Sequence, residues 1–477
     1  MNVIRSLLAF AILLLPIVAQ SAPDDSAFRI IHVTVIDGSG ASPQLDRTVL
    51  IQRSRITKIG TGDLGTPGIR TIDAKGKFLI PGLWDMHVHL MRKGRPEAYF
   101  PLLIANGITG IRDMGGDMPI AEIKRLRDEI NSGTRLGPII FAPGPLIDGP
   151  YPTLPSITRV VRDADEASAA VKELKQQGAD FIKVYNRIPR DAYFTLAATA
   201  KALSIPFAGH VPSSITAQEA SIAGQKSIEH LFNILFACSD REDELMRMKA
   251  QALSSSDSGE RIDLREKYLE TVLKSYNAEK ATALFAAFAK NGTWQTPTLV
   301  QRKAFAFPPL QTPDDPLMRF IPKSQRWRWD PRQDGRIQGR GIERQEIERQ
   351  FYDKDRALIA PMRAAGVGFL AGTDTPDGFA FPGFSLHEEL AQLVEAGLTP
   401  MEALQAATSN AANYFGLKDV GTIAVGKRAD LLLIDASPLE DIRNTRKISA
   451  VIVNGRYLSK EALSVILDKA AGEADKN

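Results

Sequence analysis

The chain has 477 residues and a mass of 52.2 kDa, with 44% hydrophobic and 24% charged residues, a composition that excludes a wholly disordered, collagenous or disulfide-stapled protein. Lys and Arg number 59 against 56 Asp and Glu, and the resulting net charge of +3 gives no argument for a nucleic-acid partner. The single cysteine, Cys238, excludes an intramolecular disulfide and a thiolate metal cluster.

The N-terminus has the pattern of a secretory signal. Arg5 precedes an uninterrupted apolar run over residues 7–15, and small residues follow up to Ala22. This apolar segment is too short to span a bilayer, which needs about 20 residues, although a retained anchor is the alternative. We therefore expect residues 1–22 to be a signal peptide, with Ala19-Gln20-Ser21 as the best cleavage site. The mature protein would then be secreted or periplasmic, with no stable membrane anchor.

Short β-branched runs at both ends of the chain predict one small β domain. The runs are residues 30–36, 48–51 and 56–59 near the N-terminus, and 429–434 and 449–453 near the C-terminus, with Asn454-Gly455 as a hairpin-type turn. Segments at opposite ends of a chain can pair with each other. We expect a small β-sandwich built from residues 27–80 and 415–460.

The middle of the chain, residues 81–414, alternates strands with helices such as 164–177 and 191–203. The eight candidate strands are residues 78–84, 107–112, 138–142, 180–184, 206–208, 226–228, 293–299 and 366–370. Eight such strands are the count of a (β/α)8 TIM barrel. An open doubly wound sheet is the alternative, but no Gly-rich phosphate-binding motif follows the first strand. The predicted fold class is therefore α/β, a TIM barrel with a small β-sandwich.

Two segments, at about residues 239–291 and 301–350, are too long for ordinary βα loops. The second contains many basic residues: Arg326-Trp327-Arg328-Trp329, then Arg332, Arg336 and Arg340. This segment has two interpretations. It could fold over the barrel mouth and present Trp327 or Trp329 beside Arg326 and Arg328, or it could form a solvated helical cap or the contact of a homo-oligomer.

Four of the six histidines fall at the ends of predicted strands. His87 and His89 lie two residues apart after the first strand, so both imidazoles can face one ion. His210 and His230 end two later strands, and Asp374 follows the last. Because all the carboxyl ends of barrel strands converge on one face, the sequence predicts a metal site there, built from nitrogen and oxygen ligands.

Lys183 is a charged residue inside an apolar strand. A buried lysine without a partner is costly, and its pKa falls. A neutral amine can react with carbon dioxide, and the resulting carbamate can bridge two cations. A salt bridge to Asp or Glu is the alternative interpretation.

These strand-end motifs resemble the amidohydrolase superfamily, in particular its imidazolonepropionase-like branch with the Xaa-Pro dipeptidases and ochratoxinases. The matching motifs are Asp85-Met86-His87-Val88-His89, Ile182-Lys183-Val184-Tyr185, Gly209-His210-Val211-Pro212, Ile228-Glu229-His230-Leu231, Gly372-Thr373-Asp374 and Gly421-Thr422-Ile423. They follow the family's order over nearly the whole mature chain. The resemblance implies that His87, His89, Lys183 and Asp374 hold one divalent ion, and that Lys183, His210 and His230 hold a second. It also implies N6-carboxylysine at Lys183 between them, with zinc as the expected metal.

The resemblance implies hydrolysis of a C–N amide bond, in which two cations activate a shared water. Asp374 would carry the proton to the leaving nitrogen, and Tyr185 could donate a hydrogen bond to the oxyanion. His387 is a further candidate for a catalytic or substrate contact. The alternatives are a packed aromatic at the barrel rim for Tyr185 and a surface-helix histidine for His387. We assign no role to His32.

The sequence departs from its relatives after the third strand. Peptidase members often carry a Gly-Gly-His element there, whereas residues 142–150 contain no histidine, which argues against simple dipeptidase activity. We expect a small-molecule amide substrate, dipeptide-like or an N-acyl amino acid. The alternatives are a lactonase, esterase or phosphotriesterase with the same site, a catalytically silent binding protein, and a deaminase, which usually works with one metal and without the bridging lysine.

Overall fold

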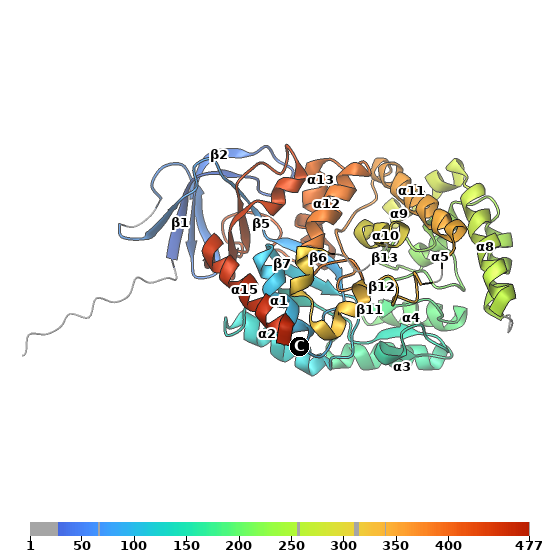
Figure 1. Cartoon of the computed structure of the whole chain (residues 1–477). Helices are drawn as coiled ribbons and strands as arrows, with labels where there is room; N and C mark the ends of the chain where they lie inside the picture. Colours follow the sequence, from blue (N-terminus) through green and yellow to red (C-terminus); the bar gives the residue numbers. More distant parts are fainter. Residues whose placement is uncertain (1–26, 65–66, 255–257, 310–313, 339, 477) are drawn as a thin grey trace, which may run out of the picture.

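The computed structural model describes residues 27–64, 67–254, 258–309, 314–338 and 340–476. The predicted signal peptide, residues 1–22, lies outside the described residues. Figure 1 shows a β-sheet on one side of the molecule, a strand-and-helix body in the middle, and the helix α8 at the far side from the sheet. None of the helices in the described ranges is both long enough and apolar enough to cross a membrane.

One eight-stranded sheet joins the two ends of the chain. Its order is β17-β16-β15-β5-β1-β2-β3, with β4 beside β1. The strands are β1 (Ala27–Val35), β2 (Gln44–Gln52), β3 (Arg55–Gly60), β4 (Arg70–Asp73), β5 (Phe78–Pro81), β15 (Leu431–Ile434), β16 (Ile448–Val453) and β17 (Arg456–Ser459). The N-terminal and C-terminal parts meet where β5 pairs antiparallel with β15, with Leu79 opposite Leu433. Both side chains are buried in the same apolar cluster, so burial of apolar surface holds the two chain ends together.

The strands of the body pair in parallel. Their runs are β6-β7-β8 and β10-β9-β11-β12-β13-β14. The strands are β6 (Leu83–Val88), β7 (Ile108–Asp113), β8 (Ile139–Phe141), β9 (Leu146–Asp148), β10 (Thr158–Val160), β11 (Ile182–Val184), β12 (Phe207–Gly209), β13 (Ser227–Glu229) and β14 (Trp294–Thr296). Residues 368–371 close the ring, because Leu370 N donates to Gln295 O and Met86 N donates to Ala371 O. This closure makes the fold a barrel and excludes the open sheet.

The structure corrects the predicted first strand, residues 78–84, by dividing it at Gly82. The part before Gly82 is β5 of the small sheet, and the part after it is β6 of the barrel. A methyl group at Gly82 would lie 2.2 Å from Thr109 Oγ1, so only glycine fits where the chain passes between the two sheets. The run is apolar on both sides of the break, which is why hydrophobic patterning does not reveal the division.

The predicted helix over residues 164–177 is confirmed as α3 (Ala164–Gln177). The Asp163 side chain caps its N-terminus and Gly178 ends it in the left-handed conformation. Its buried face repeats at helical spacing: Ala167, Ala170, Val171 and Leu174. The other helices of the body are α1 (Arg95–Ala105), α2 (Ile120–Asn131), α4 (Arg190–Ala202), α5 (Ala217–Ile222), α9 (Ala278–Asn291), α11 (Ile342–Ala364), α12 (Ser385–Glu395), α13 (Pro400–Ala406) and α14 (Ser409–Phe415).

Both long segments contain structure of their own. The first forms α6 (Ile234–Ala237), α7 (Glu242–Ser254) and α8 (Ser258–Lys274) before α9, with α8 at the end of the molecule remote from the small sheet (Figure 1). The second forms α10 (Leu299–Ala306) and the 3-10 helices η2 (Pro316–Phe320) and η3 (Lys323–Trp329) before α11. The last helix, α15 (Lys460–Lys476), packs against α1, η2 and η3. The second segment is therefore attached to the body rather than free in solvent.

Candidate metal centre

The strand-end residues predicted to bind metal come together on one face of the barrel. His87 lies in β6 and His89 directly follows it, while Lys183 lies in β11. His210 and His230 each follow the last residue of a strand, β12 and β13. Asp374 comes three residues after the segment that closes the ring, and its backbone N donates to His87 O over 2.8 Å. The parallel strands all point the same way, and this direction brings the side chains together.

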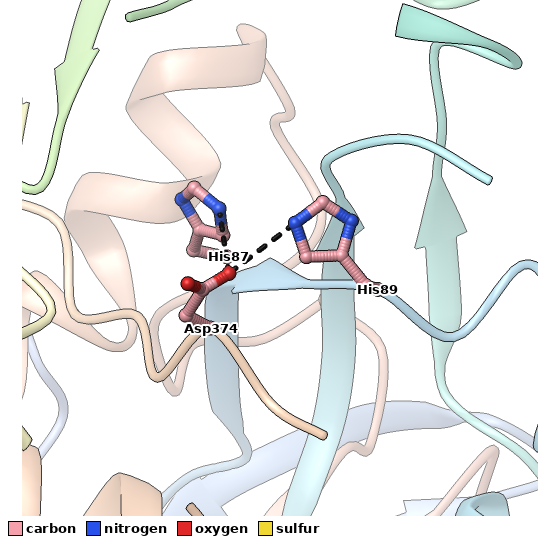
Figure 2. A group of neighbouring side chains, drawn as sticks. All are labelled: His87, His89 and Asp374. Atoms are coloured by element: carbon pink, nitrogen blue, oxygen red, sulfur yellow. Dashed lines mark ion pairs between the residues drawn. The ribbon is translucent and has the colours of Figure 1, made fainter. Parts of the chain in front are cut away.

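Three of these residues form a compact ligand group. Ligand atoms of His87, His89 and Asp374 all lie within 4.8 Å of one another. The Nε2 atoms of His87 and His89 are each 3.2 Å from Asp374 Oδ1 (Figure 2). Two imidazoles and one carboxylate in this arrangement are suitable ligands for a divalent transition-metal ion.

The other three predicted ligands adjoin this group. The His230 ring lies 4.5 Å from the His87 ring, and the His210 ring lies 4.9 Å from the His230 ring, measured between centroids. Lys183 is fully buried, and its charge acts on both His210 and His230. A second set of possible metal ligands, around Lys183, therefore lies next to the first group.

All four histidines are held through Nδ1. The acceptor atoms are Glu229 Oε2 for His87 at 2.8 Å, Gly115 O for His89 at 2.8 Å, Asn186 Oδ1 for His210 at 2.7 Å and Thr298 Oγ1 for His230 at 2.6 Å. An acceptor at Nδ1 fixes the tautomer and the ring orientation, and it leaves Nε2 to face an ion. These bonds orient the four rings in a way that is compatible with metal ligation.

Lys183 is the least satisfied residue of the cluster. Its Nζ is buried and has no hydrogen-bond partner among the described residues. Burial lowers the pKa of Lys183 to about 8, although Glu229 and Asp374 act in the opposite direction. This direction enlarges the neutral fraction of the amine, the form that carbamate formation requires. The alternative of a direct salt bridge is not what the structure shows, because no ion pair to Lys183 is formed within the described ranges.

The protonation states also suit a cation. Burial lowers the pKa values of His210 and His230 well below their ordinary range, so both rings are neutral. Burial alone would raise the pKa of Asp374, but hydrogen bonds from His87 and His89 act in the opposite direction and its pKa lies well below its usual range, so Asp374 is a carboxylate. Neutral imidazoles and an ionised carboxylate are the forms that ligate metals. The residues present therefore fit a site for divalent metal ions.

Two of these ligands have strained backbones. His230 has φ 61° and Asp374 has φ 62°, both in the left-handed region that non-glycine residues rarely adopt. Such conformations cost of order 1–3 kcal/mol each and persist where the surroundings enforce them. The strain lies at the two strand ends that aim ligands into the cluster, which is consistent with selection for the site rather than for stability.

A buried ion-pair network supports His87 from the barrel interior. Glu229 Oε2, which accepts from His87 Nδ1, lies 2.7 Å from Arg112 Nη2. Arg112 also donates to Met86 O, Ser227 Oγ, Tyr414 Oη and Thr296 Oγ1. Burial alone would raise the pKa of Glu229, but Arg112 and His87 hold it below its usual range. Sequence reasoning missed this pair, although both residues are charged and lie in apolar strands, the signal that identified Lys183.

A second missed residue, Asp85, connects β6 to the loop of Asp374. Asp85 Oδ1 accepts from the backbone N of His87 at 3.2 Å and of Thr373 at 3.1 Å, and Oδ2 accepts from Thr373 Oγ1 at 2.7 Å. Burial raises the pKa of Asp85 to about 7. These bonds fix the residues on either side of the ligand group relative to each other.

Tyr185 lies at the cluster, as expected from its place after β11. Its ring is 4.3 Å from that of His210, and Lys183 Nζ is 5.9 Å from the Tyr185 ring. Burial raises the pKa of the Tyr185 phenol above its usual value, so it stays protonated. It can therefore act as a hydrogen-bond donor at the site.

His387 does not belong to the site, which corrects its interpretation as a catalytic residue. It is buried in α12, with Nδ1 2.9 Å from Thr445 Oγ1 and Nε2 3.1 Å from Asn106 O. Asn106 precedes β7, so the ring lies at the opposite end of that strand from the ligands. The sequence places His387 on a helix, but it does not show which end of the barrel the side chain faces. His32 lies in β1 beside Asp73, remote from the centre.

The arginine-rich segment contacts the loop that carries Asp374, but it does so through Arg336 rather than through the expected Arg-Trp residues 326–329. Arg336 Nη1 and Nη2 pair with both carboxylate oxygens of Asp377, at 2.6 and 2.7 Å. Trp329 is instead fully buried and stacks near Phe381, with 5.9 Å between centroids. Arg326 is turned away to Asp475 in α15, at 3.2 Å. Of the four residues 326–329, the structure leaves Trp327 and Arg328 available at this surface.

Comparison with known proteins identifies the family of this chain. The model of the amidohydrolase family matches residues 78–458. The chain therefore belongs to the amidohydrolase family, which consists of hydrolases that act on carbon–nitrogen bonds. Imidazolonepropionase of Deinococcus deserti is 44% identical over 88 residues, which are 18% of this chain and 22% of that protein. The match thus spans about a fifth of this curated relative.

Solved structures with the same fold cover nearly the whole chain. Bottromycin amidohydrolase superposes with a TM-score of 0.74 at 22% identity, over 94% of this chain and 91% of that one. A Xaa-Pro dipeptidase with bound methionine superposes with a TM-score of 0.64 at 21% identity, over 91% and 100%. These likenesses confirm the predicted TIM-barrel fold class and the predicted resemblance to the imidazolonepropionase and Xaa-Pro dipeptidase branch.

Proposed function

We propose that this protein is a binuclear metal-dependent amidohydrolase that cleaves a C–N amide bond. The observation that carries the proposal is the buried, unpartnered Nζ of Lys183 beside Asp374 and histidines that are each held through Nδ1. An amine in this setting costs free energy unless it serves a ligand. A hydrolytic metal centre accounts for the lysine, the histidines and the carboxylate together.

We assign the ligands in two sets. His87, His89, Lys183 and Asp374 would hold one divalent ion, and Lys183, His210 and His230 would hold the other, with zinc as the expected metal. The neutral Lys183 amine would add to carbon dioxide, forming an N–C bond and releasing one proton to solvent, and the carbamate would be the oxygen ligand that the two sets share. When bound, the two ions would activate a water molecule and polarise the carbonyl group of the substrate.

The residues of the chain move the proton and stabilise the developing charge. Asp374 is ionised and lies between the two histidines of the first set, so it can take the proton of the attacking water and pass it to the leaving nitrogen. Tyr185 keeps its phenolic proton and can donate it in a hydrogen bond to the oxyanion. Asp85 and Glu229 hold the ligands in place through their bonds to His87 and Thr373.

The substrate class follows from the missing histidine after the third strand and from the relatives. At the corresponding place the chain has Asp148, whose carboxylate accepts from the backbone N of Gly149 at 2.9 Å and of Arg187. Because Asp148 carries a carboxylate, this loop is not suited to bind a substrate carboxylate, the role expected of the histidine in the dipeptidases. The names of the structural neighbours bottromycin amidohydrolase and Xaa-Pro dipeptidase support an amide substrate. We propose an N-acyl amino acid or a dipeptide-like amide.

Metal removal tests this proposal directly. We expect purified protein to contain about two divalent ions per chain and to lose amide hydrolysis on chelation, because a metal centre supplies several kcal/mol of transition-state stabilisation. Zinc should restore the activity, and the melting temperature should fall on chelation and recover with it. The measurements are metal analysis, calorimetry and parallel turnover assays with N-acyl amino acids, dipeptides, lactones and phosphotriesters. Full turnover of amides by metal-free protein would overturn the proposal.

We also propose export from the cytoplasm, on the sequence pattern of residues 1–22 alone. Expression of the whole chain with N-terminal sequencing of the mature protein would test it. The expected result is a new N-terminus close to Ala22, and an intact Met1 on protein recovered from the cytoplasm would contradict it.

A further inference from the structure

An ion pair joins the second long segment to the loop that follows Asp374. Arg336 Nη1 lies 2.6 Å from Asp377 Oδ2, and Arg336 Nη2 lies 2.7 Å from Asp377 Oδ1, so the two side chains form a bidentate pair. Arg336 is itself held in place, because it donates to both carboxylate oxygens of Asp334 and lies over the Phe305 ring, 4.5 Å from the centroid. A bidentate bond to a fixed guanidinium determines the orientation of Asp377 as well as its distance.

Other contacts hold the same loop against the second segment. Gln301 Nε2 donates to Asp377 Oδ2 at 3.3 Å. A methyl group at Gly378 would lie 2.4 Å from Arg328 O and 3.5 Å from Asp334 Oδ2, so the backbone of the loop packs directly on residues of the segment. The second segment therefore covers the loop at two consecutive residues, Asp377 and Gly378.

The position of Asp377 is coupled to that of Asp374. Asp377 N donates to Asp374 O at 3.0 Å, so residues 374–377 form a single turn. The start of this turn is attached to β6, because Asp374 N donates to His87 O at 2.8 Å. Asp374 has φ 62°, a conformation that persists only where the surroundings enforce it. The turn that presents Asp374 is thus held by the barrel at one end and by the second segment at the other.

The ion pair matters more for geometry than for stability. The Arg336 side chain is 48% exposed, and an ion pair with such exposure contributes little to the free energy of unfolding. Catalysis, in contrast, depends on orientation, because a misplacement of about 1 Å can lower a rate about 100-fold. We propose that Arg336 is a positioning residue that holds Asp374 in place through Asp377, so that proton transfer at the metal centre depends on the second long segment. This inference rests on the proposed function, which assigns the proton transfer to Asp374.

Asp377→Asn tests the positioning role with the least disturbance of the fold. It removes the charge that faces Arg336 but leaves Arg336 paired with Asp334, and asparagine can still accept from Gly378 N, as Asp377 Oδ1 does at 3.0 Å. With N-acetyl-L-phenylalanine as the substrate and zinc in excess, we expect kcat to fall about 10- to 100-fold and KM to stay within about twofold. Arg336→Met should lower kcat by a similar factor, and the double variant should lower it no further.

The matched control is an ion pair of the same segment that does not involve the loop. Arg326 pairs with Asp475 in α15, with 3.2 Å between Arg326 Nη2 and Asp475 Oδ1. Arg326→Met should therefore keep the wild-type kcat. The melting temperature of Asp377→Asn should stay close to that of the wild type, because the pair it breaks is half-exposed.

Hydrogen exchange separates this inference from the proposed function, since it needs no substrate. In the purified whole protein, the backbone amides of Asp374 and Asp377 should exchange about 10-fold faster in Asp377→Asn than in the wild type, while those of α3 keep the wild-type rate. Faster exchange confined to the loop supports the hold on Asp374 even if no amide is hydrolysed, in which case only the proposed function fails. Wild-type exchange in the loop, a wild-type kcat in Asp377→Asn, or an equal loss of kcat in Arg326→Met would overturn the positioning role and leave the hydrolase intact.

Discussion

Replacing Lys183 by methionine is expected to abolish hydrolysis while making the metal-free protein more stable. Loss of the shared ligand removes several kcal/mol of transition-state stabilisation, so kcat/KM should fall on the order of 10³-fold, and about one ion or none should remain bound. Lys183 Nζ is buried without a partner, so its removal should raise the unfolding free energy of the metal-free protein by about 1–3 kcal/mol. Metal analysis, kinetics and urea unfolding measure the three effects.

Opposite changes in activity and stability distinguish a ligand from a structural lysine. The matched control is Lys226→Met, because Lys226 directly precedes β13, at the end of that strand away from the ligands, and its Nζ lies 4.7 Å from the Tyr414 ring centroid. This variant should keep its metal ions and its kcat. Intact-mass measurement of gently handled wild-type protein should also show the mass of one added carbon dioxide, absent from Lys183→Met. Wild-type activity and metal content in Lys183→Met would contradict the bridging role.

Replacing Arg112 by methionine is expected to cause the largest loss of stability. Glu229 is fully buried, and its charge is balanced by Arg112, 2.7 Å away. Removing one partner of such a pair leaves an uncompensated buried charge and costs about 3–5 kcal/mol. His87 would also lose the orientation that Glu229 gives it, so metal affinity should fall about 10- to 100-fold. Urea unfolding and competition with a metal-binding dye measure the two losses.

The control for this prediction is an ion pair at the surface. Arg190 pairs with Glu219, and their side chains are 54% and 31% exposed. Arg190→Met should therefore cost less than about 1 kcal/mol and leave metal binding unchanged. A loss of similar size in both variants would show that the Arg112 effect reflects general packing rather than the buried charge.

Much of the site could be predicted because metal ligation requires particular residue types at strand ends. His87 and His89 at a spacing of two, and Lys183 within an apolar run, violate the pattern that packing alone would produce. The convergence of these residues follows from one property of parallel barrels, the common direction of the strands. The same reasoning did not extend to His387, because a helix covers the full height of the barrel and its sequence does not state which end a side chain faces.

The charged residues inside strands also show what could not be predicted from the sequence, namely their partners. Arg112 and Glu229 carry the signal that identified Lys183, but their meaning depends on which distant residue each one meets. These partners are 117 residues apart in the chain. A sequence shows that a buried charge must be compensated, whereas only the folded barrel shows that the two compensate each other and that His87 completes the network.

The sequence by itself therefore determined the barrel, the candidate ligand residues and the family resemblance, because local patterns of burial and residue type encode them. Only the tertiary structure decided the division of the first strand at Gly82 and the place of His387. It also decided that Trp329 is buried and that Arg326 pairs with Asp475 rather than facing the site. These features depend on contacts between segments far apart in the chain, and on the balance of charge that such contacts leave, which no local pattern records.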